Sequence, residues 1–290
     1  MSAPPAARVS CRQIAAADLP AVADLLHAGF PKRPHSYWVA GLHRLTVRTQ
    51  PDGYPKYGYL LQSGGEVVGV LLLIFSARDE GSGPVLRGNV SSWHVRPAFR
   101  AYAPLLVLRA IRHPAATYLN VSPAPDTLPI IAAQGFRPFS RGMFAALPLL
   151  ARTGAARLRA RPAQWQAAAI PQADLRLLAD HAAFGCLGLW CETGQGGQPL
   201  IFRRRRIKPG GIPCAQLIYC RSLEDLEAVA GPVGRFLALR GMPLMLVACD
   251  RTLRGVPGRL FPDRLPMYFK GAEAPRQGDL SYTEAALFGM

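Results

Sequence analysis

The stretch that decides the fold is HVRPAFRAYAPLLVLRAI, residues 94–111. It begins with the pattern of a strand and ends with that of a helix, and a short turn carrying Arg100 lies between them. A helix N-terminus presents backbone N–H groups to an anion, so this layout is typical of a pyrophosphate site. Such loops normally contain glycine, whereas this turn contains Ala101 and Ala103. The alternative interpretation is a turn that serves only the fold.

The residues on either side of this stretch predict a mixed α/β fold. A strand and a helix are expected within residues 10–30, a second helix over 36–46 and a hairpin over 57–78, closed by Ser63-Gly64-Gly65. A long strand over 85–95 leads into the turn and its helix. A strand over 116–121, a short helix over 126–136 and a last strand over 140–150 complete this half.

The second half repeats part of that order. Residues 151–173 are basic and rich in Ala and Pro, which predicts a connector. Beyond it we expect a helix over 175–185, a hairpin over 187–208, a strand over 212–220, and a helix over 222–241 with a possible break at Gly231-Pro232. Strands over 243–250 and 279–289 follow. The sequence therefore predicts domains at residues 1–150 and 174–290.

Three short motifs within residues 10–150 resemble those of the GNAT family of acyl-CoA N-acyltransferases. The segment 95–103, VRPAFRAYA, resembles the family's V-x-P-x-[YF]-R-G-x-G turn, and YLNV at 118–121 and QGF at 134–136 follow in the family's order. The resemblance implies a GNAT-like α/β fold, a mixed sheet with flanking helices, in two tandem halves. It also implies acetyl-CoA or another acyl-CoA as co-substrate and transfer of the acyl group to an unidentified amine.

The same resemblance places the co-substrate on particular residues. The pyrophosphate is expected at the turn and the pantetheine arm along the backbone of the preceding strand, which together give the set Trp93, Val95, Arg100, Ala101, Tyr102 and Ala103. Pro104 removes one N–H donor from the first helical turn. An inactive member of the fold, acting as a binding or regulatory protein, is therefore the alternative function.

Catalytic groups are harder to assign. The tyrosine that often serves as the family's general acid corresponds here to Ile131, so that acid is missing. His94 has the chemistry of a base near neutral pH, but its side chain alternates with those of Trp93 and Val95, which also permits a structural role. Asn120 and Ser122 could orient a carbonyl or a thiolate.

In the second half, the strand over 212–220 leads into a helix start that is acidic. Glu224, Asp225 and Glu227 suit the positive end of a helix dipole but would repel a pyrophosphate. We therefore expect acyl-CoA in the first half only, with the second half shaping the acceptor pocket.

The net charge of +16 raises the question of a nucleic-acid partner. The bases are scattered except for the run Arg203–Arg206, which we interpret as part of a charged edge strand, the alternative being a site for an acidic acceptor. We expect a small-molecule or acidic acceptor that bears an amine, and no nucleic acid or membrane partner.

Cysteine spacing and hydropathy argue against a zinc protein, a membrane-spanning protein and a secreted protein. The six cysteines form no C-x-x-C pair, so buried thiols are favoured over a zinc site. The longest apolar run, residues 67–75, is far shorter than the roughly 20 residues that span a bilayer. The N-terminus lacks the apolar core of a secretory signal. These features predict a cytoplasmic protein.

Overall fold

The computed structural model describes residues 8–79, 83–152, 154–207 and 210–289, and divides the chain into two compact units, residues 1–120 and 121–290. The expected domain limits at residues 150 and 173 stay a prediction, because compactness alone does not test independent folding. In the described residues, no helix is long and apolar enough to cross a membrane.

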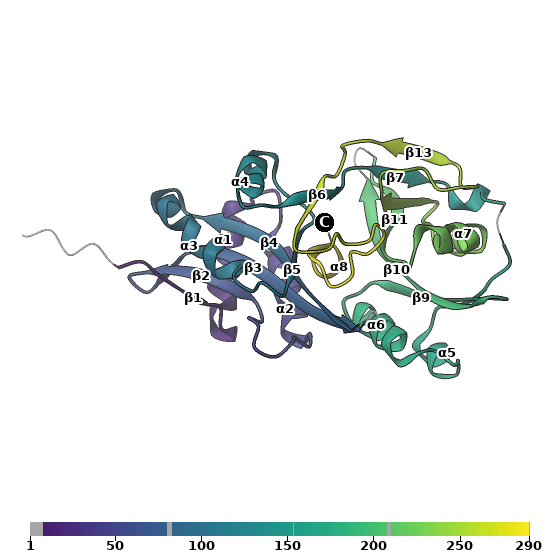
Figure 1. The fold of residues 1–290 in the computed structure, drawn as a ribbon, viewed down its shortest axis with the longest axis horizontal. Helices are drawn as coiled ribbons and strands as arrows, with labels where there is room; N and C mark the ends of the chain where they lie inside the picture. The colour runs from purple at the N-terminus through teal and green to yellow at the C-terminus, as the bar shows by residue number, and fades with distance from the viewer. Residues whose placement is uncertain (1–7, 80–82, 153, 208–209, 290) are drawn as a thin grey trace, which may run out of the picture. The chain divides into compact units, whose positions relative to one another are not determined.

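The first unit is built on five strands in the order β1-β2-β3-β4-β5 (Figure 1). They are β1 (Ser10–Gln13), β2 (Gly58–Ser63), β3 (Glu66–Asp79), β4 (Pro84–Val95) and β5 (Thr117–Asn120). The first four pair antiparallel, and β5 runs parallel to β4. The predicted hairpin and long strand are confirmed. A parallel neighbour requires a crossover, which here contains the decisive turn and helix.

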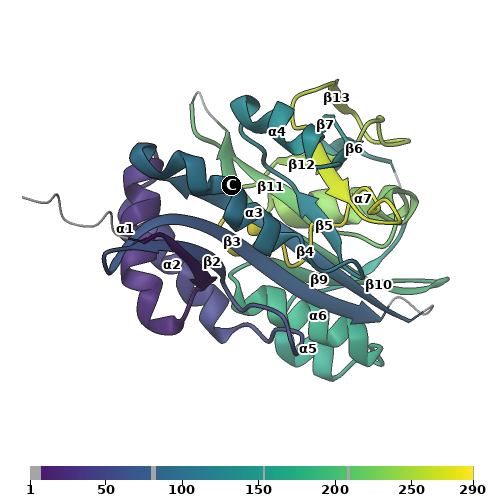
Figure 2. The same ribbon diagram turned by 60° about the vertical axis from the view of Figure 1, so that its left-hand side comes forward.

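Helices cover both faces of this sheet. The helices α1 (Leu19–Gly29) and α2 (His35–Val47) lie on one face, and α3 (Ala103–Ala110) lies on the other (Figure 2). Leu60, Leu72 and Phe75 are fully buried between these layers. Short 3-10 turns, η1 (Ala16–Asp18) and η2 (Pro97–Tyr102), lead into α1 and α3.

The second unit contains a seven-stranded sheet in the order β13-β7-β12-β11-β10-β9-β8. Its strands are β7 (Met143–Ala146), β8 (Arg157–Arg159), β9 (Leu187–Thr193), β10 (Gly196–Ile207), β11 (Ile212–Tyr219), β12 (Leu244–Ala248) and β13 (Gly258–Phe261). β9, β10 and β11 are antiparallel neighbours, and β12 runs parallel to β11 after a helical crossover. This order repeats that of β2, β3, β4 and β5, so the predicted echo between the halves is confirmed.

The helices of this unit again enclose the sheet. α7 (Leu223–Ala238) covers the face that carries Leu189 and Leu217. α5 (Pro162–Gln166) and α6 (Gln172–Ala183) lie on the opposite face, where a Cβ at Gly188 would come 3.0 Å from the ring of Trp165. The possible break at Gly231-Pro232 is wrong, because α7 continues through both residues.

The remaining elements complete the unit. They are η3 (Pro125–Thr127), α4 (Leu128–Ala133), β6 (Arg137–Ser140), η4 (Pro148–Leu150), β14 (Met267–Lys270) and α8 (Glu284–Leu287). β6 pairs with β14. Gly135, after α4, adopts a φ of 82°, as a helix end of this type requires.

Three expectations about strands are wrong. Residues 140–150 do not form one strand: β7 follows β6 after a turn and joins β12 and β13. The turn is fixed by Asp250, whose carboxylate accepts the N–H groups of Arg141 and Gly142 at 2.6 and 2.8 Å. Residues 279–289 contain the helix α8, because Glu-Ala-Ala-Leu favours a helix. The Arg203–Arg206 strand, β10, is not at an edge, since β9 and β11 flank it.

Candidate functional site

The parallel strands β4 and β5 pair over only three residues. Arg87–Asn89 face Thr117–Leu119, after which β4 continues to Val95 while β5 ends at Asn120. Asn89, which is 1% exposed, lies at the branch point and donates its side-chain amide to Leu119 O at 3.1 Å. On the side of β4 away from β3, no backbone hydrogen bond to Trp93, His94 or Val95 is found among the described residues. A gap therefore opens between the two strands.

A β-bulge re-aims β4 beside this gap. Leu71 pairs with Trp93 and Leu72 with Ser91, so Ser92 is an extra residue, and it adopts a φ of 45°. Positive φ is uncommon outside glycine, and bulges often lie next to sites where a strand must present its backbone differently. The indole N–H of Trp93 is buried and has no hydrogen-bond partner in the described part of the chain.

The turn that follows is a 3-10 helix continuous with α3. Tyr102, at φ −91° and ψ −4°, and Ala103, at φ −53° and ψ −37°, lie in the right-handed helical region. No residue here needs positive φ, which explains how alanines replace the expected glycines. The 3-10 conformation leaves fewer backbone N–H groups free to donate to a phosphate. Phe99 N–H already donates to Arg96 O at 2.9 Å, Ala103 N–H donates to Arg100 O, and Pro97 and Pro104 have none.

Arg100 is the available cation of this turn. Its side chain is exposed, and no hydrogen bond or ion pair to it occurs within the described ranges. By contrast, the neighbouring Arg96 forms an ion pair with Glu66 at 2.8 Å. A phosphate at the end of β4 would thus meet one free guanidinium and the start of α3.

His94 points to the face of the sheet that α1 covers. A Cβ on Gly29 would lie 2.4 Å from its ring, and its ring centroid is 6.0 Å from that of Phe30, so it packs against the end of α1. It borders an open groove of about 760 Å³ between α1 and the β2–β3 turn. Burial, and then the charge of Arg100, lower the pKa of His94. The imidazole is therefore neutral at pH 7.

The other two candidate residues lie at or just after the end of β5. Asn120 is its last residue and is half-buried, whereas Ser122 is exposed. Within the second unit, the hydroxyl of Ser122 donates a hydrogen bond to a carboxylate oxygen of Glu284, in α8. Sequence reasoning missed Glu284 because it placed this residue in a strand, and it missed Asn89 because nothing in the pattern marks a branch point.

The matching place in the second unit is filled by the chain itself. β11 pairs with β12 only over Cys214–Gln216. Beyond that, residues 278–280 lie along β11: Cys220 N–H donates to Gly278 O at 2.9 Å, and Leu280 N–H donates to Ile218 O at 2.8 Å. Because β10 occupies the other side of β11, this segment lies along the part of β11 that corresponds to the part of β4 beyond its pairing with β5.

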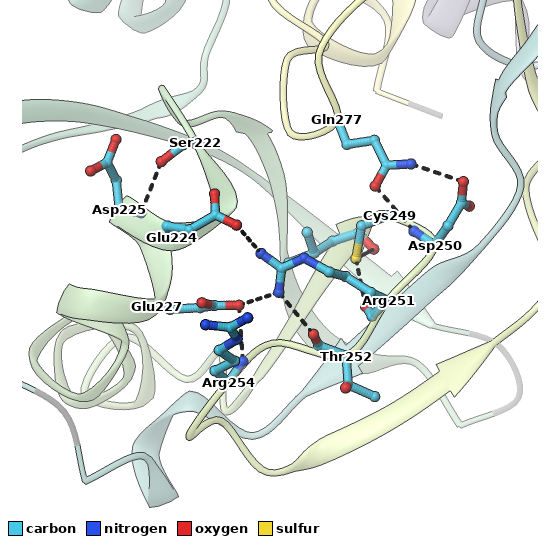
Figure 3. A network of polar contacts seen from close by, with 11 residues as sticks. Ser222, Glu224, Asp225, Glu227, Cys249, Asp250, Arg251, Thr252, Arg254 and Gln277 are labelled. Carbon is cyan, nitrogen blue, oxygen red and sulfur yellow. Dashed lines mark hydrogen bonds and ion pairs between the residues drawn. The ribbon is translucent and has the colours of Figure 1, made fainter.

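The start of α7 is likewise occupied. Ser222 caps the helix by accepting the N–H of Asp225 at 3.0 Å. Arg251 reaches over from the end of β12 and pairs with Glu224, at 2.6 Å, and with Glu227 (Figure 3). The carboxylates and the arginine satisfy each other where a pyrophosphate and its cation would otherwise meet.

The arginine run forms contacts within the second unit. Arg203 donates to Phe184 O at 3.2 Å and to Ala286 O, and Arg205 donates to Gln216 at 2.9 Å. Arg204 and Arg206, on the alternate face, bond backbone carbonyls and are exposed. Over the described residues, no group of three His, Cys, Asp or Glu side chains is arranged to hold a metal ion.

No protein-family model and no curated protein matches the chain. Solved structures do match it. The chain has the GNAT fold. A GCN5-related N-acetyltransferase from Anabaena variabilis aligns with a TM-score of 0.56 at 10% identity, over 90% of this chain and 72% of that one. One from Kribbella flavida gives 0.55 at 14% identity, over 93% and 72%.

The GNAT match extends through both halves. A candidate acetyltransferase from Pyrococcus horikoshii aligns over 94% of this chain and 93% of its own, with a TM-score of 0.55 at 12% identity. The predicted fold, a mixed α/β arrangement in two GNAT-like halves, is thereby confirmed. At these identities the likeness shows the fold and not the activity.

Proposed function

We propose that this protein is an acyl-CoA-dependent N-acyltransferase that binds its co-substrate in the first unit. The observation that carries the proposal is the gap between β4 and β5, which begins at Asn89 and leads through the Ser92 bulge to the exposed Arg100. An extended pantetheine arm would bond the free backbone of Trp93 and Val95 in the way that an added strand does.

The pyrophosphate and the thioester of the co-substrate would each lie beside a different part of β4. The pyrophosphate would lie at the turn, with Arg100 supplying a charge-assisted hydrogen bond and α3 its positive end. The thioester would lie nearer the bulge. The amine nitrogen attacks the thioester carbonyl carbon, a C–N bond forms, the C–S bond breaks, and the thiolate takes up a proton. The acceptor we propose is a small molecule with an amine.

The two halves would then have different roles. Residues 278–280 and the Arg251 ion pairs occupy the second unit's corresponding space, as described above. We therefore expect one acyl-CoA per chain. The second unit would not bind a co-substrate of its own.

A specific observation favours the alternative, a GNAT-fold protein that binds a ligand without catalysis. In the 3-10 turn, the N–H groups of Phe99 and Ala103 donate to carbonyl oxygens of the turn itself. Fewer backbone donors therefore remain for a pyrophosphate. A protein of this kind would bind acyl-CoA weakly or not at all and would release no thiol in the presence of amines.

Calorimetry with acetyl-CoA tests the proposal. We expect the wild type to bind one equivalent, and Arg100→Glu to weaken binding by about 10- to 100-fold, since a hydrogen bond to a charged group contributes about 1.5–3 kcal/mol. Arg109→Glu is the matched control, because Arg109 is exposed in the last turn of α3 and should leave the affinity within about twofold. Equal losses in the two variants, or no binding by the wild type, would contradict the proposed site.

A further inference from the structure

Two arginines of β10 face the solvent on the side of the sheet that α7 covers. Arg204 and Arg206 are exposed and alternate with Arg203 and Arg205, which make their contacts on the opposite face. Arg204 and Arg206 share their face with Phe202, which packs in the core beneath α7. Residues two positions apart on a strand are separated by about 7 Å, so the two guanidinium groups can contact one ligand.

A third arginine joins them from the end of α7. Arg204 donates to the backbone oxygen of Arg240 at 3.3 Å, and Arg240 follows the last residue of α7 by two positions. The guanidinium carbon of Arg240 lies 3.5 Å from the ring centroid of Phe236, and its Nη1 donates to Phe236 O at 3.3 Å. Arg206 donates to Gly211 O at 3.1 Å. Backbone carbonyls therefore hold all three side chains, and each guanidinium, with five N–H donors, can still donate to a ligand.

No carboxylate balances the charge of this arginine cluster, Arg204, Arg206 and Arg240. The sequence has no Asp or Glu in residues 193–223 or 228–249, which include β10, β11 and the end of α7. Within the described ranges, no ion pair to any of the three arginines is found. The chain itself therefore leaves three neighbouring positive charges uncompensated.

Phosphate is the anion that matches the arginine cluster best. A phosphate monoester carries nearly two negative charges at neutral pH, and its oxygens accept paired hydrogen bonds from a planar guanidinium. A single carboxylate would neutralise only one of the three charges. Single-stranded nucleic acid also uses aromatic rings on which its bases stack, but the Arg240 guanidinium covers the ring of Phe236 next to the cluster. The charge and the covered ring together favour a small phosphorylated ligand.

We propose that Arg204, Arg206 and Arg240 bind a small ligand that carries two or more phosphate groups. The site lies within the second unit, on residues that take no part in the acyl-CoA site proposed above, and the inference does not rest on acyl transfer. The carbonyl contacts of the three side chains restrict their motion before the ligand arrives, which lowers the entropy lost on binding. Because the arginines are exposed, salt should weaken the binding.

Calorimetry at low ionic strength tests the site with tripolyphosphate, pyrophosphate and orthophosphate as probes. We expect one equivalent of tripolyphosphate to bind, and the affinity to fall from tripolyphosphate to orthophosphate. Arg204→Gln and Arg240→Gln should each weaken tripolyphosphate binding by about 10-fold, since each removes charge-assisted hydrogen bonds. Arg264→Gln is the matched control, because Arg264 is exposed between β13 and β14, and its affinity should stay within about twofold of the wild type.

The Arg100→Glu variant separates this site from the one proposed for acyl-CoA, because it should bind tripolyphosphate as the wild type does. A loss of tripolyphosphate binding in Arg100→Glu would place the anion in the first unit and overturn the inference. No binding by the wild type, or equal losses in Arg204→Gln and Arg264→Gln, would also overturn it. Tighter binding of oligodeoxythymidine than of tripolyphosphate would indicate a nucleic-acid surface instead. The substituted side chains are exposed, so the variants should fold, which circular dichroism checks.

Discussion

Gly234→Val is expected to lower the free energy of unfolding of the second unit by about 3 kcal/mol, the upper end of what overpacking a core usually costs. Gly234 is buried in α7, where a Cβ would lie 2.1 Å from the carbonyl carbon of Pro148 and 2.3 Å from the backbone nitrogen of Leu149. These are backbone atoms of η4, so no side chain can rotate away. The helix would have to separate from η4, and apolar contacts along α7 would be lost.

Chemical denaturation measures this effect. Gly194→Ala is the control, since a Cβ there has no neighbour within 4 Å and the φ of Gly194 is not positive; its unfolding midpoint should match the wild type. Gly234→Ala should be destabilised less than Gly234→Val, because alanine regains part of the loss through helix propensity. A Gly234→Val protein as stable as the wild type would show that α7 does not pack on η4 as described.

The sequence was sufficient for the topology of the first unit. The decisive turn, the β2–β3 hairpin and the long strand before the turn all have local signals: apolar alternation, a Ser-Gly-Gly turn, and a change of period from two to 3.6. The order of these elements then restricts the chain to a hairpin followed by a parallel crossover. The same signals recur in the second half, which is why the echo could be predicted.

The site depends on features that have no local signal. Asn89 ends the β4–β5 pairing through a contact to Leu119, and Glu284 meets Ser122 from the far end of the chain. Both are consequences of tertiary packing. The segment 279–289 was placed in a strand because its alternation fits a strand as well as a helix, and short apolar runs do not distinguish the two. Because this segment was assigned to a strand, the contact between Glu284 and Ser122 was not predicted.

The lack of glycine in the turn has a physical explanation that the sequence alone did not give. Glycine is needed where φ is positive, and Ala101 and Ala103 would therefore disfavour a turn of the glycine-rich kind. The 3-10 conformation of η2 removes that requirement. What remains different from a glycine-rich loop is the number of free N–H groups, and this makes Arg100 the group on which phosphate affinity should depend most.

Asp279→Ala is expected to lower the free energy of unfolding by about 3 kcal/mol, the smaller end of what breaking a buried ion pair costs. Asp279 is fully buried; it accepts the N–H and hydroxyl of Ser281 at 3.1 and 2.6 Å and pairs with Arg276 at 3.4 Å. The lower end applies because the Arg276 side chain is 39% exposed, so water can partly replace its partner.

The loss of stability should arise where Asp279 anchors the segment that closes the β11 edge and leads to Tyr282 and α8. Thermal and denaturant unfolding measure the change. Asp126→Ala, at an exposed carboxylate in η3, is the control and should leave the stability unchanged. An Asp279→Ala protein as stable as the wild type would show that the buried carboxylate does not hold this segment in place.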